Sequence, residues 1–258
     1  MYKTLTREEL CKLVNFPQKK EVDSVIVYGT SPTKRDEKIK ILNKVLSEFS
    51  NVKKVHNIQN DFFSTIYEFQ IGNKLIWFDL VYGGAYLSEL LHLACMLGSK
   101  KNFLIGSCGG LQKNLKSGEI VIPRYTYGNE SSTRRYQPEI KDNKHYADEK
   151  LRNTLLHEFK DYKTYDGAII TCQAMRGETE EDIKRWSKKG YLGIDMESST
   201  LFAVSNSFNV PSVALLHISD NLVNNILYGS KDLKKNKEYM RELDIIKFEK
   251  ILENIVNN

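Results

Sequence analysis

Cysteine is scarce in this chain and has no recognisable pattern. Among 258 residues there are four cysteines, Cys11, Cys95, Cys108 and Cys172, with no Cys-x-x-Cys pair and no zinc-type spacing. We therefore expect reduced thiols, as in a cytoplasmic protein, and no disulfide framework.

Long apolar runs and a strong excess of one charge are also absent. The longest apolar runs are too short to cross a membrane, and the charged first ten residues predict no secretory signal. The net charge is only +5 and the lysines are scattered, so we expect them on the solvated surface, with no nucleic-acid or membrane partner. With 41% hydrophobic and 28% charged residues, the composition is that of a globular protein. The mildly basic balance is compatible with a small anionic substrate.

Short apolar runs alternate along the chain with segments of helical periodicity. The predicted strands are 24–29, 64–70, 74–82, 102–106, 119–123, 167–171 and 212–218. The predicted helices are 34–49, a segment after Gly83 and Gly84, 148–159, 180–189, a segment after Glu197, and a terminal helix around Phe248. Residues 125–144 read as a long polar connection. This alternation predicts an α/β fold with a mixed, largely parallel sheet. Because no linker or repeat interrupts it, we expect a single domain over residues 1–258.

Five polar or glycine-rich segments directly follow expected strand ends, one of which is near Gly193. They are 29–35, 106–110, 171–175, 195–197 and 219–220. Since ligands of open α/β sheets bind beyond the carboxyl ends of strands, these segments are expected to converge on one cleft. Residues 106–110, Gly-Ser-Cys-Gly-Gly, predict a turn whose amides and Ser107 hydroxyl surround an anion, or else a tight turn without a ligand.

Two acidic residues stand at the ends of apolar segments. Glu197 is either a favourable charge at a helix start or an acceptor for two neighbouring hydroxyl groups. Asp220 closes an apolar strand, as a cap for the next segment or as a general acid. His92 and His217 lie in apolar runs and are expected to be core residues rather than metal ligands.

The order and spacing of these motifs resemble the nucleoside phosphorylase-I family of purine nucleoside phosphorylases, uridine phosphorylases and nucleosidases. The resemblance extends from about Ser24 to the terminal helix, and three motifs carry it: residues 106–110 with 118–123, residues 195–198 (Asp-Met-Glu-Ser) and residues 218–220 (Ile-Ser-Asp). It implies a three-layer α/β/α sandwich with a mixed, partly closed sheet, and self-association into a dimer or a trimer of dimers.

The resemblance also implies a role for each site residue. It assigns phosphate to Gly29, Arg35 and Ser107, ribose to Met196 and Glu197, the base to Cys108, Gly109 and Ser219, and catalysis to Asp220. Asp195 is expected to support the site. The small-molecule partners are then a nucleoside and inorganic phosphate as co-substrate, with no metal and no organic cofactor.

The aspartate after serine decides the expected substrate class. In purine-specific members this aspartate protonates the imidazole nitrogen of the departing base, whereas uridine phosphorylases read uracil with a glutamine and an arginine. Gln173 and Arg176 lie in that region here, but their spacing does not match the pyrimidine pattern. The resemblance therefore predicts a purine nucleoside phosphorylase acting on purine (2'-deoxy)ribonucleosides.

Two departures from the family pattern concern the phosphate. Leu104 stands where phosphorolytic members commonly carry an arginine, and the first turn leaves either Lys34 or Arg35 to contact phosphate. The alternatives are therefore a hydrolytic purine nucleosidase or nucleotide nucleosidase, a uridine phosphorylase, or a non-catalytic nucleoside-binding protein. Neither the preferred nucleoside nor the choice of dimer or hexamer follows from the sequence.

Overall fold

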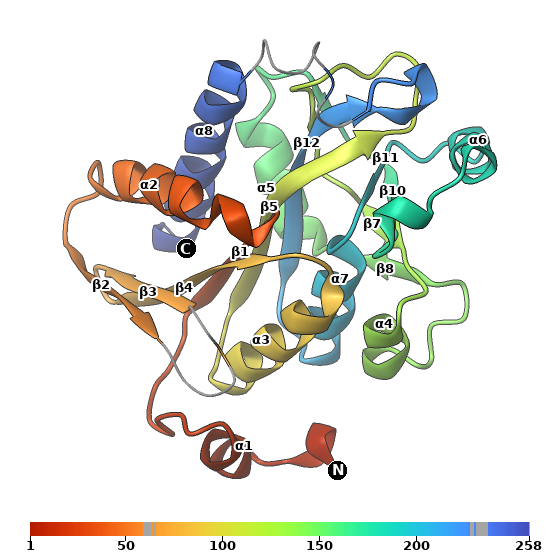
Figure 1. Cartoon of the computed structure of the whole chain (residues 1–258). Coiled ribbons are helices and arrows are strands. Elements are labelled where there is room, and N and C mark those ends of the chain that lie inside the picture. Colours follow the sequence, from red (N-terminus) through yellow and green to blue (C-terminus); the bar gives the residue numbers. More distant parts are fainter. Residues whose placement is uncertain (59–62, 64–65, 228–229, 231–236, 258) are drawn as a thin grey trace.

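One large mixed sheet forms the centre of the molecule (Figure 1). A computed structural model of the chain describes residues 1–58, 63, 66–227, 230 and 237–257. The strands are β1 (Ser24–Gly29), β2 (Val52–Ile58), β3 (Ile66–Ile71), β4 (Lys74–Val81), β5 (Lys101–Gly110), β6 (Ile120–Val121), β7 (Tyr125–Tyr127), β8 (Lys144–Tyr146), β9 (Thr164–Tyr165), β10 (Ala168–Thr171), β11 (Gly193–Asp195) and β12 (Ser212–Asn221). The main path runs β2-β3-β4-β1-β5-β11-β10-β7-β8, and β12, β6 and β9 branch from β5.

Strand β5 changes its neighbour along one edge. It pairs with β1 in parallel as far as Ile105, and with β11 in antiparallel fashion at Gly109 and Gly110. Its other edge pairs with β12 throughout. Ser107 and Cys108 therefore lie where β1 has ended and β11 has not begun, a switch point of the kind that opens crevices in α/β sheets.

Helices cover both faces of this sheet. They are α1 (Arg7–Leu13), α2 (Arg35–Leu46), α3 (Gly84–Met96), α4 (Ser131–Tyr136), α5 (Glu149–Glu158), α6 (Glu180–Lys188), α7 (Ser198–Ser207) and α8 (Lys237–Val256). Alternate residues of a strand face opposite sides. Phe103 and Ile105 thus join a core with α2, α5 and α8, while Leu104 joins a second core with α3 and α7.

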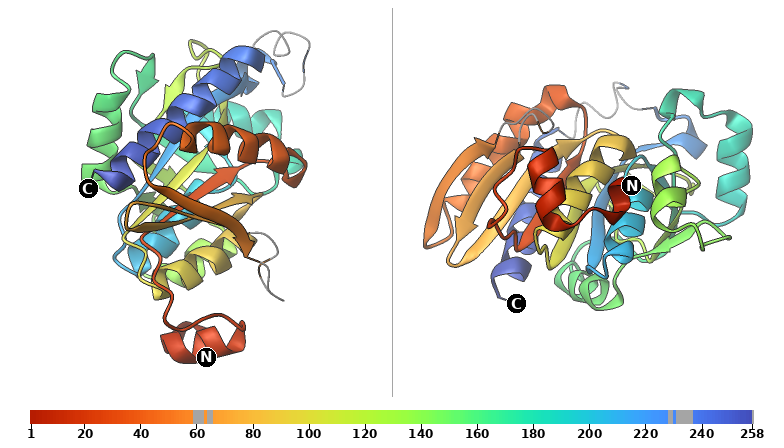
Figure 2. Two further views of the ribbon diagram at one scale, coloured as in Figure 1. Left: turned by 90° about the vertical axis from the view of Figure 1, so that its left-hand side faces the viewer. Right: turned by 90° about the horizontal axis from the view of Figure 1, so that it is seen from below.

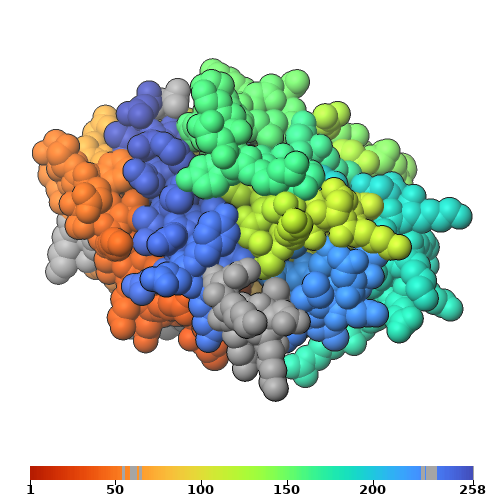
Figure 3. Space-filling model, turned by 90° about the horizontal axis from the view of Figure 1, so that it is seen from above, coloured from red at the N-terminus to blue at the C-terminus, as the bar shows by residue number. Residues whose placement is uncertain are grey.

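The views of the molecule agree with this layering. Seen from above, α8 (blue) lies between α2 (orange) and α5 (green) (Figure 3). Helix α1 lies at the end of the molecule away from α8 (Figure 2), and its Cys11 is buried in the core that α3 and α7 share. The expected three-layer α/β/α sandwich with a mixed sheet is confirmed. The sheet branches at β5 rather than closing on itself within the described residues.

Most predicted elements are present with shifted ends. All seven predicted strands and all six predicted helices have a counterpart, although positions 64 and 65 of the strand expected at 64–70 lie outside the described residues. The hairpin at Gly72 joins β3 to β4. The expected polar connection over residues 125–144 is wrong, because β7, α4 and the start of β8 lie in it. Strand β2, the short strands β7, β8 and β9, and the helices α1 and α4 were not predicted. The single-domain assignment of residues 1–258 stays a prediction.

The turn expected at residues 106–110 is also wrong, since β5 continues through Gly110. The glycines serve close packing between strands rather than a bend. A Cβ added at Gly109 would lie 3.1 Å from Leu222 and 3.3 Å from Ile194, and one at Gly193 would lie 2.8 Å from the Cys108 Sγ. Glycine therefore lets β11 approach β5 at the point where the neighbour changes.

The terminal helix α8 is attached to the sheet by a buried apolar stripe. Phe248 is fully buried and contacts Phe78 edge-on, with ring centroids 5.5 Å apart. In the described part of the chain, neither α8 nor any other helix combines the length and the apolar character needed to cross a membrane.

Replacing Phe248 with alanine tests this attachment. We expect the Phe248→Ala change to lower the free energy of unfolding by about 3–5 kcal/mol, because it removes a fully buried ring and leaves a cavity. Glu249→Ala, at the exposed neighbouring position, should change it by less than about 0.5 kcal/mol. Urea unfolding of the three proteins measures both values. Equal losses for the two variants would contradict the packing described for α8.

Candidate active site

A cavity of about 350 Å³ opens at the switch point of β5. Eight of the nine predicted site residues line it: Gly29, Ser107, Cys108, Gly109, Met196, Glu197, Ser219 and Asp220. The ninth, Arg35, is not among the lining residues. The expected convergence of strand ends on one cleft is thus confirmed for the ends of β1, β5, β11 and β12.

Asp195 is a structural support of this cavity. Its Oδ1 accepts a hydrogen bond from the Thr171 hydroxyl at 2.7 Å, and its Oδ2 accepts bonds from the Ser198 amide, at 2.9 Å, and the Ser198 hydroxyl. The carboxylate therefore joins β10 to the first turn of α7 and holds the intervening residues 196–197. Thr171 belongs to a segment expected to converge on the cleft, but it does not line the cavity and instead serves this joint.

Glu197 extends from this joint into the cavity. Its Oε1 accepts a hydrogen bond from the Gly83 amide at 2.7 Å. A Cβ added at Gly29 would lie only 2.8 Å from Glu197 Oε2, so the glycine at the end of β1 leaves room for the carboxylate. Burial, together with the Asp195 charge, raises the pKa of Glu197 to about 8. Ligand hydroxyls that hydrogen-bond this group would favour its charged form.

Asp220 lies at the bulge where the register of β12 and β5 shifts. Its side chain is buried, and Oδ1 accepts a short hydrogen bond from the Ser219 hydroxyl. The Ser219 hydroxyl also lies 3.2 Å from the Cys108 carbonyl oxygen. Burial, with the charges of Asp195 and Asp220, raises the pKa of Cys108 well above its ordinary value, so the thiol stays neutral. Cys108 therefore lines the cavity with an uncharged side chain.

The residues expected to hold phosphate are only partly brought together. Gly29 and Ser107 line the cavity, but Arg35 makes a salt bridge with buried Asp79 at 2.7 Å. Lys34 makes a salt bridge with Glu37 at 3.0 Å on the surface. Leu104 is buried in the apolar core. A contact from Arg35 to phosphate would require its salt bridge with Asp79 to open.

The lining of the cavity also contains residues outside the three family motifs. Met175 and Arg176, from the short helix η3 (Met175–Gly177), and Glu178 after it all line the cavity. Burial, with the negative charge of Asp220, raises the pKa of Glu178 to about 7. No short motif marks these residues. The one available signal was their place just after a predicted strand.

Gln173, in the same segment, is turned away from the cavity. Its side-chain amide donates to the Thr200 hydroxyl at 3.3 Å, and its backbone amide donates to Glu130 Oε1 at 3.3 Å. The pair expected of a pyrimidine site, a glutamine and an arginine, is therefore not assembled. Only Arg176 reaches the cavity wall.

Both histidines singled out in the sequence are satisfied in the interior. His92 Nδ1 lies 2.8 Å from the Tyr136 hydroxyl, and His217 Nδ1 lies 2.8 Å from the Lys247 Nζ. The expectation that they are core residues is confirmed. Among the described residues, no group of three or more His, Cys, Asp or Glu side chains is placed to hold a metal ion. The expected independence from metals and organic cofactors stays a prediction.

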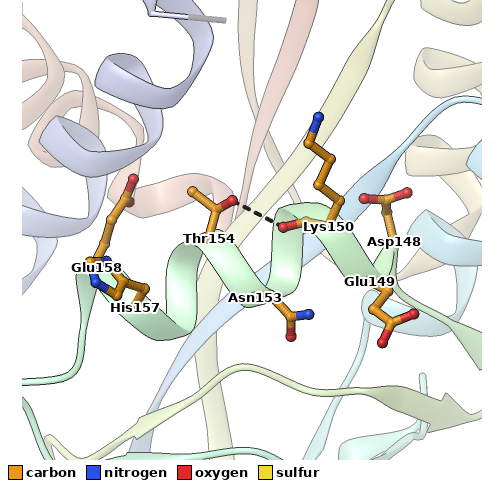
Figure 4. A pocket seen from close by; sticks show the side chains of 7 residues that line it. All are labelled: Asp148, Glu149, Lys150, Asn153, Thr154, His157 and Glu158. Atoms are coloured by element: carbon orange, nitrogen blue, oxygen red, sulfur yellow. Dashed lines mark hydrogen bonds between the residues drawn. The ribbon is translucent and has the colours of Figure 1, made fainter.

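A second hollow, of about 800 Å³, lies beside α5 (Figure 4). Its seven lining residues, from Asp148 to Glu158, lie on successive turns of α5 and at its N-cap. Their side chains spread along the helix, and the bond drawn among them runs from the Thr154 hydroxyl to the Lys150 carbonyl oxygen at 3.0 Å. One helix face does not enclose a ligand, so we place the candidate site at the β5 switch point.

The geometry of this site agrees with comparisons to known proteins. The family model described as the phosphorylase superfamily matches residues 84–256. The chain belongs to this superfamily. The expected resemblance is thereby confirmed, and the expectation of a pentosyltransferase is confirmed at the level of the family.

Superfamily relatives named purine nucleoside phosphorylase DeoD-type match part of the chain. The protein of Clostridium beijerinckii is 26% identical over 168 residues, which cover 64% of this chain and 69% of that protein. The protein of Buchnera aphidicola is 27% identical over 152 residues, covering 57% and 62%. A guanosine phosphorylase of Halorubrum lacusprofundi is 26% identical over 122 residues, covering 46% and 49%. The matches thus span about half to two thirds of these relatives.

Solved superfamily structures show the same fold. A crystal structure of uridine phosphorylase from Vibrio fischeri, complexed with 6-hydroxy-1-naphthoic acid, has a TM-score of 0.70 and covers 92% of this chain and 94% of that chain. A second structure of uridine phosphorylase from Vibrio fischeri has a TM-score of 0.67. The sequence identity in both is 21%, so these structures establish the fold and leave the substrate open.

The buried carboxyl group of Glu197 predicts a pH-dependent effect of Glu197→Gln on stability. The raised pKa of Glu197 means that the folded state keeps a proton the unfolded state has lost, so stability falls as pH rises from 4.5 toward about 8. Glutamine has no such proton. Thermal unfolding should therefore show the melting temperature of Glu197→Gln, relative to wild type, increasing between about pH 5 and pH 8.5.

Glu249→Gln, at an exposed position of α8, is the matched control and should show no comparable trend. A difference between Glu197→Gln and wild type that is the same at every pH would show that burial does not oppose ionisation of Glu197.

Proposed function

We propose that the protein is a purine nucleoside phosphorylase. It would cleave the glycosidic bond of purine (2'-deoxy)ribonucleosides with phosphate, giving the free base and (deoxy)ribose 1-phosphate. The observation that carries this proposal is the placement of Glu197, Asp220 and Ser107 around one cavity. These side chains suit the sugar, the base and the phosphate, respectively.

In this proposal each group acts at one part of the substrate. Glu197 accepts hydrogen bonds from the ribose hydroxyls, and Met196 packs against the sugar. Phosphate lies against Gly29 and Ser107 and forms a C–O bond to the anomeric carbon while the C–N bond breaks. Asp220 donates its proton to the imidazole nitrogen of the purine, so the base leaves without negative charge. Cys108, Gly109 and Ser219 line the base.

Purine is favoured over uracil by two observations. A buried aspartate stands at the cavity, and Gln173 is engaged with Thr200 rather than with the cavity. The solved structures named uridine phosphorylase share the fold at 21% identity, which is too low to transfer their substrate. The names of the sequence relatives also favour purine nucleosides.

Hydrolysis is the second candidate, with water in place of phosphate. It is favoured by Leu104, which is part of the core, and by the Arg35 salt bridge with Asp79. The deciding experiment is to incubate inosine with the protein, with and without phosphate, and to identify the sugar product. Phosphate-dependent formation of ribose 1-phosphate supports the proposal. Equal base release in both, with free ribose as product, would establish the hydrolase instead.

A binding protein without turnover is the remaining alternative. Inosine binding with no product after long incubation, with or without phosphate, would establish it, and robust turnover would remove it. Self-association into a dimer or a trimer of dimers, and a cytoplasmic location, remain predictions at this stage.

Asp220→Asn tests the assignment of the general acid. The change keeps the shape of the side chain but removes its proton, so turnover of inosine should fall by about 10²–10⁴-fold. A nucleoside with a better leaving group needs less protonation and should lose much less. Steady-state kinetics on both substrates measure the contrast.

Glu197→Gln is the comparison variant, and it should lower kcat/KM for both substrates by a similar factor, because both share the ribose. Inosine turnover near the wild-type rate in Asp220→Asn would remove the main support for a purine substrate.

A further inference from the structure

A buried cluster of charged and polar side chains lies behind the cavity, on the face of the sheet that α2 and α8 cover. Its members come from β1, α2, β12 and α8: Tyr28, Lys38, His217, Asp244 and Lys247. Lys247 is 0% exposed, and Asp244 is 2% exposed. Charged groups are rarely buried this deeply unless they are paired with a group of opposite charge. We therefore compare the number of positive and negative groups in the cluster.

The contacts of Lys247 favour its ammonium form. Its Nζ lies 2.8 Å from Asp244 Oδ1, 2.8 Å from His217 Nδ1 and 3.3 Å from the Gly106 carbonyl oxygen. As an ammonium, Lys247 has one hydrogen for each of these three acceptors. Burial lowers the pKa of Lys247, and the Asp244 carboxylate at 2.8 Å opposes this by stabilising the charged form. His217 is then the acceptor at Nδ1. This agrees with its pKa, which burial and the Lys247 charge lower to about 3.

Asp244 does not balance all the positive charge. Its carboxylate accepts hydrogen bonds from Tyr28 Oη at 2.7 Å, Lys38 Nζ at 2.6 Å and Lys247 Nζ. Burial alone would raise the pKa of Asp244, but the two ammonium groups lower it below the ordinary value. Two ammoniums and one carboxylate leave an excess of one positive charge. Glu37, 3.6 Å from Lys38, is half exposed, so solvent screens its contribution.

This excess charge lies close to the phosphate end of the cavity. Lys247 donates to the carbonyl of Gly106, and one peptide unit joins that carbonyl to Ser107, which lines the cavity. Tyr28 directly precedes Gly29, which lines it too. Because the cluster is buried, salt and water screen its field much less than that of a surface lysine.

We propose that Lys247 and Lys38 supply, from behind the sheet, the positive charge that attracts phosphate to Gly29 and Ser107. An arginine at position 104 would attract phosphate by its positive charge, and in this proposal the two lysines supply that charge instead. Position 104 can then be a leucine that packs in the apolar core. Both lysines are positioning residues, since neither lines the cavity. This inference rests on the proposed function, because it concerns the phosphate site of the same cavity.

The test removes the excess charge in two independent ways. Lys247→Met and Lys38→Met each leave one ammonium opposite one carboxylate, so each should weaken binding of inorganic phosphate by roughly tenfold or more. Lys38→Arg keeps the charge and should bind phosphate like wild type. Titration calorimetry at fixed ionic strength gives the phosphate Kd of each protein, and inosine is titrated separately.

Lys101→Met is the matched control. Lys101 also joins β5 to α8, donating to the Asn254 carbonyl oxygen at 3.2 Å, but at the opposite end of the strand from the cavity. Its loss should leave the phosphate Kd unchanged. The inosine Kd should stay within about twofold in all variants, because a charge effect on phosphate does not act on a neutral nucleoside.

Several results would overturn the inference. Unchanged phosphate binding in both methionine variants would overturn it, as would a wild-type protein that binds no phosphate. An equal loss of phosphate and inosine affinity would also overturn it, because it would indicate a merely structural role. The proposed function fails separately. If wild type cleaves inosine equally without phosphate but Lys247→Met and Lys38→Met still weaken phosphate binding, phosphorolysis is wrong and the charge assignment holds.

Discussion

The change of neighbour along one edge of β5 is the constraint on which the site depends. Since β1 leaves that edge after Ile105 and β11 joins it only at Gly109, Ser107 and Cys108 face a space that no strand fills. Glycines at 109 and 193 permit the close approach of β11, and the bulge in β12 places Asp220 beside them. The cavity is therefore a consequence of how the sheet branches.

The site at this branch of the sheet contains buried charged groups, and neighbouring residues stabilise each of them by hydrogen bonds or ion pairs. Asp195 is held by Thr171 and Ser198, and this joint places Glu197 opposite the end of β1. On the other face, Asp244 and Lys247 form a paired cluster behind Ser107. In the proposed function, Glu197 and Asp220 thus face the sugar and the base, while the excess of positive charge lies behind Ser107, where phosphate would bind.

The sequence predicts the central strands and most of the residues that line the cavity, but not the path of every strand or the pairing of distant residues. Apolar runs closed by glycine marked the central strands, and short motifs marked eight residues that line the cavity. The strand path through residues 106–110 was missed because glycine signals a turn locally, whereas here packing against β11 requires it. Arg176 and Glu178 belong to no motif. The pairing of Lys247 with His217 joins residues 30 positions apart, and only the tertiary fold brings them together.

The most direct test of this account is a crystal structure of the protein with a purine nucleoside and sulfate or phosphate bound. We expect the ribose hydroxyls within hydrogen-bond distance of Glu197, the imidazole nitrogen of the base beside Asp220, and the anion against Gly29 and Ser107. A nucleoside bound in the opposite orientation, or an anion held by Arg176 instead of Gly29 and Ser107, would contradict these roles.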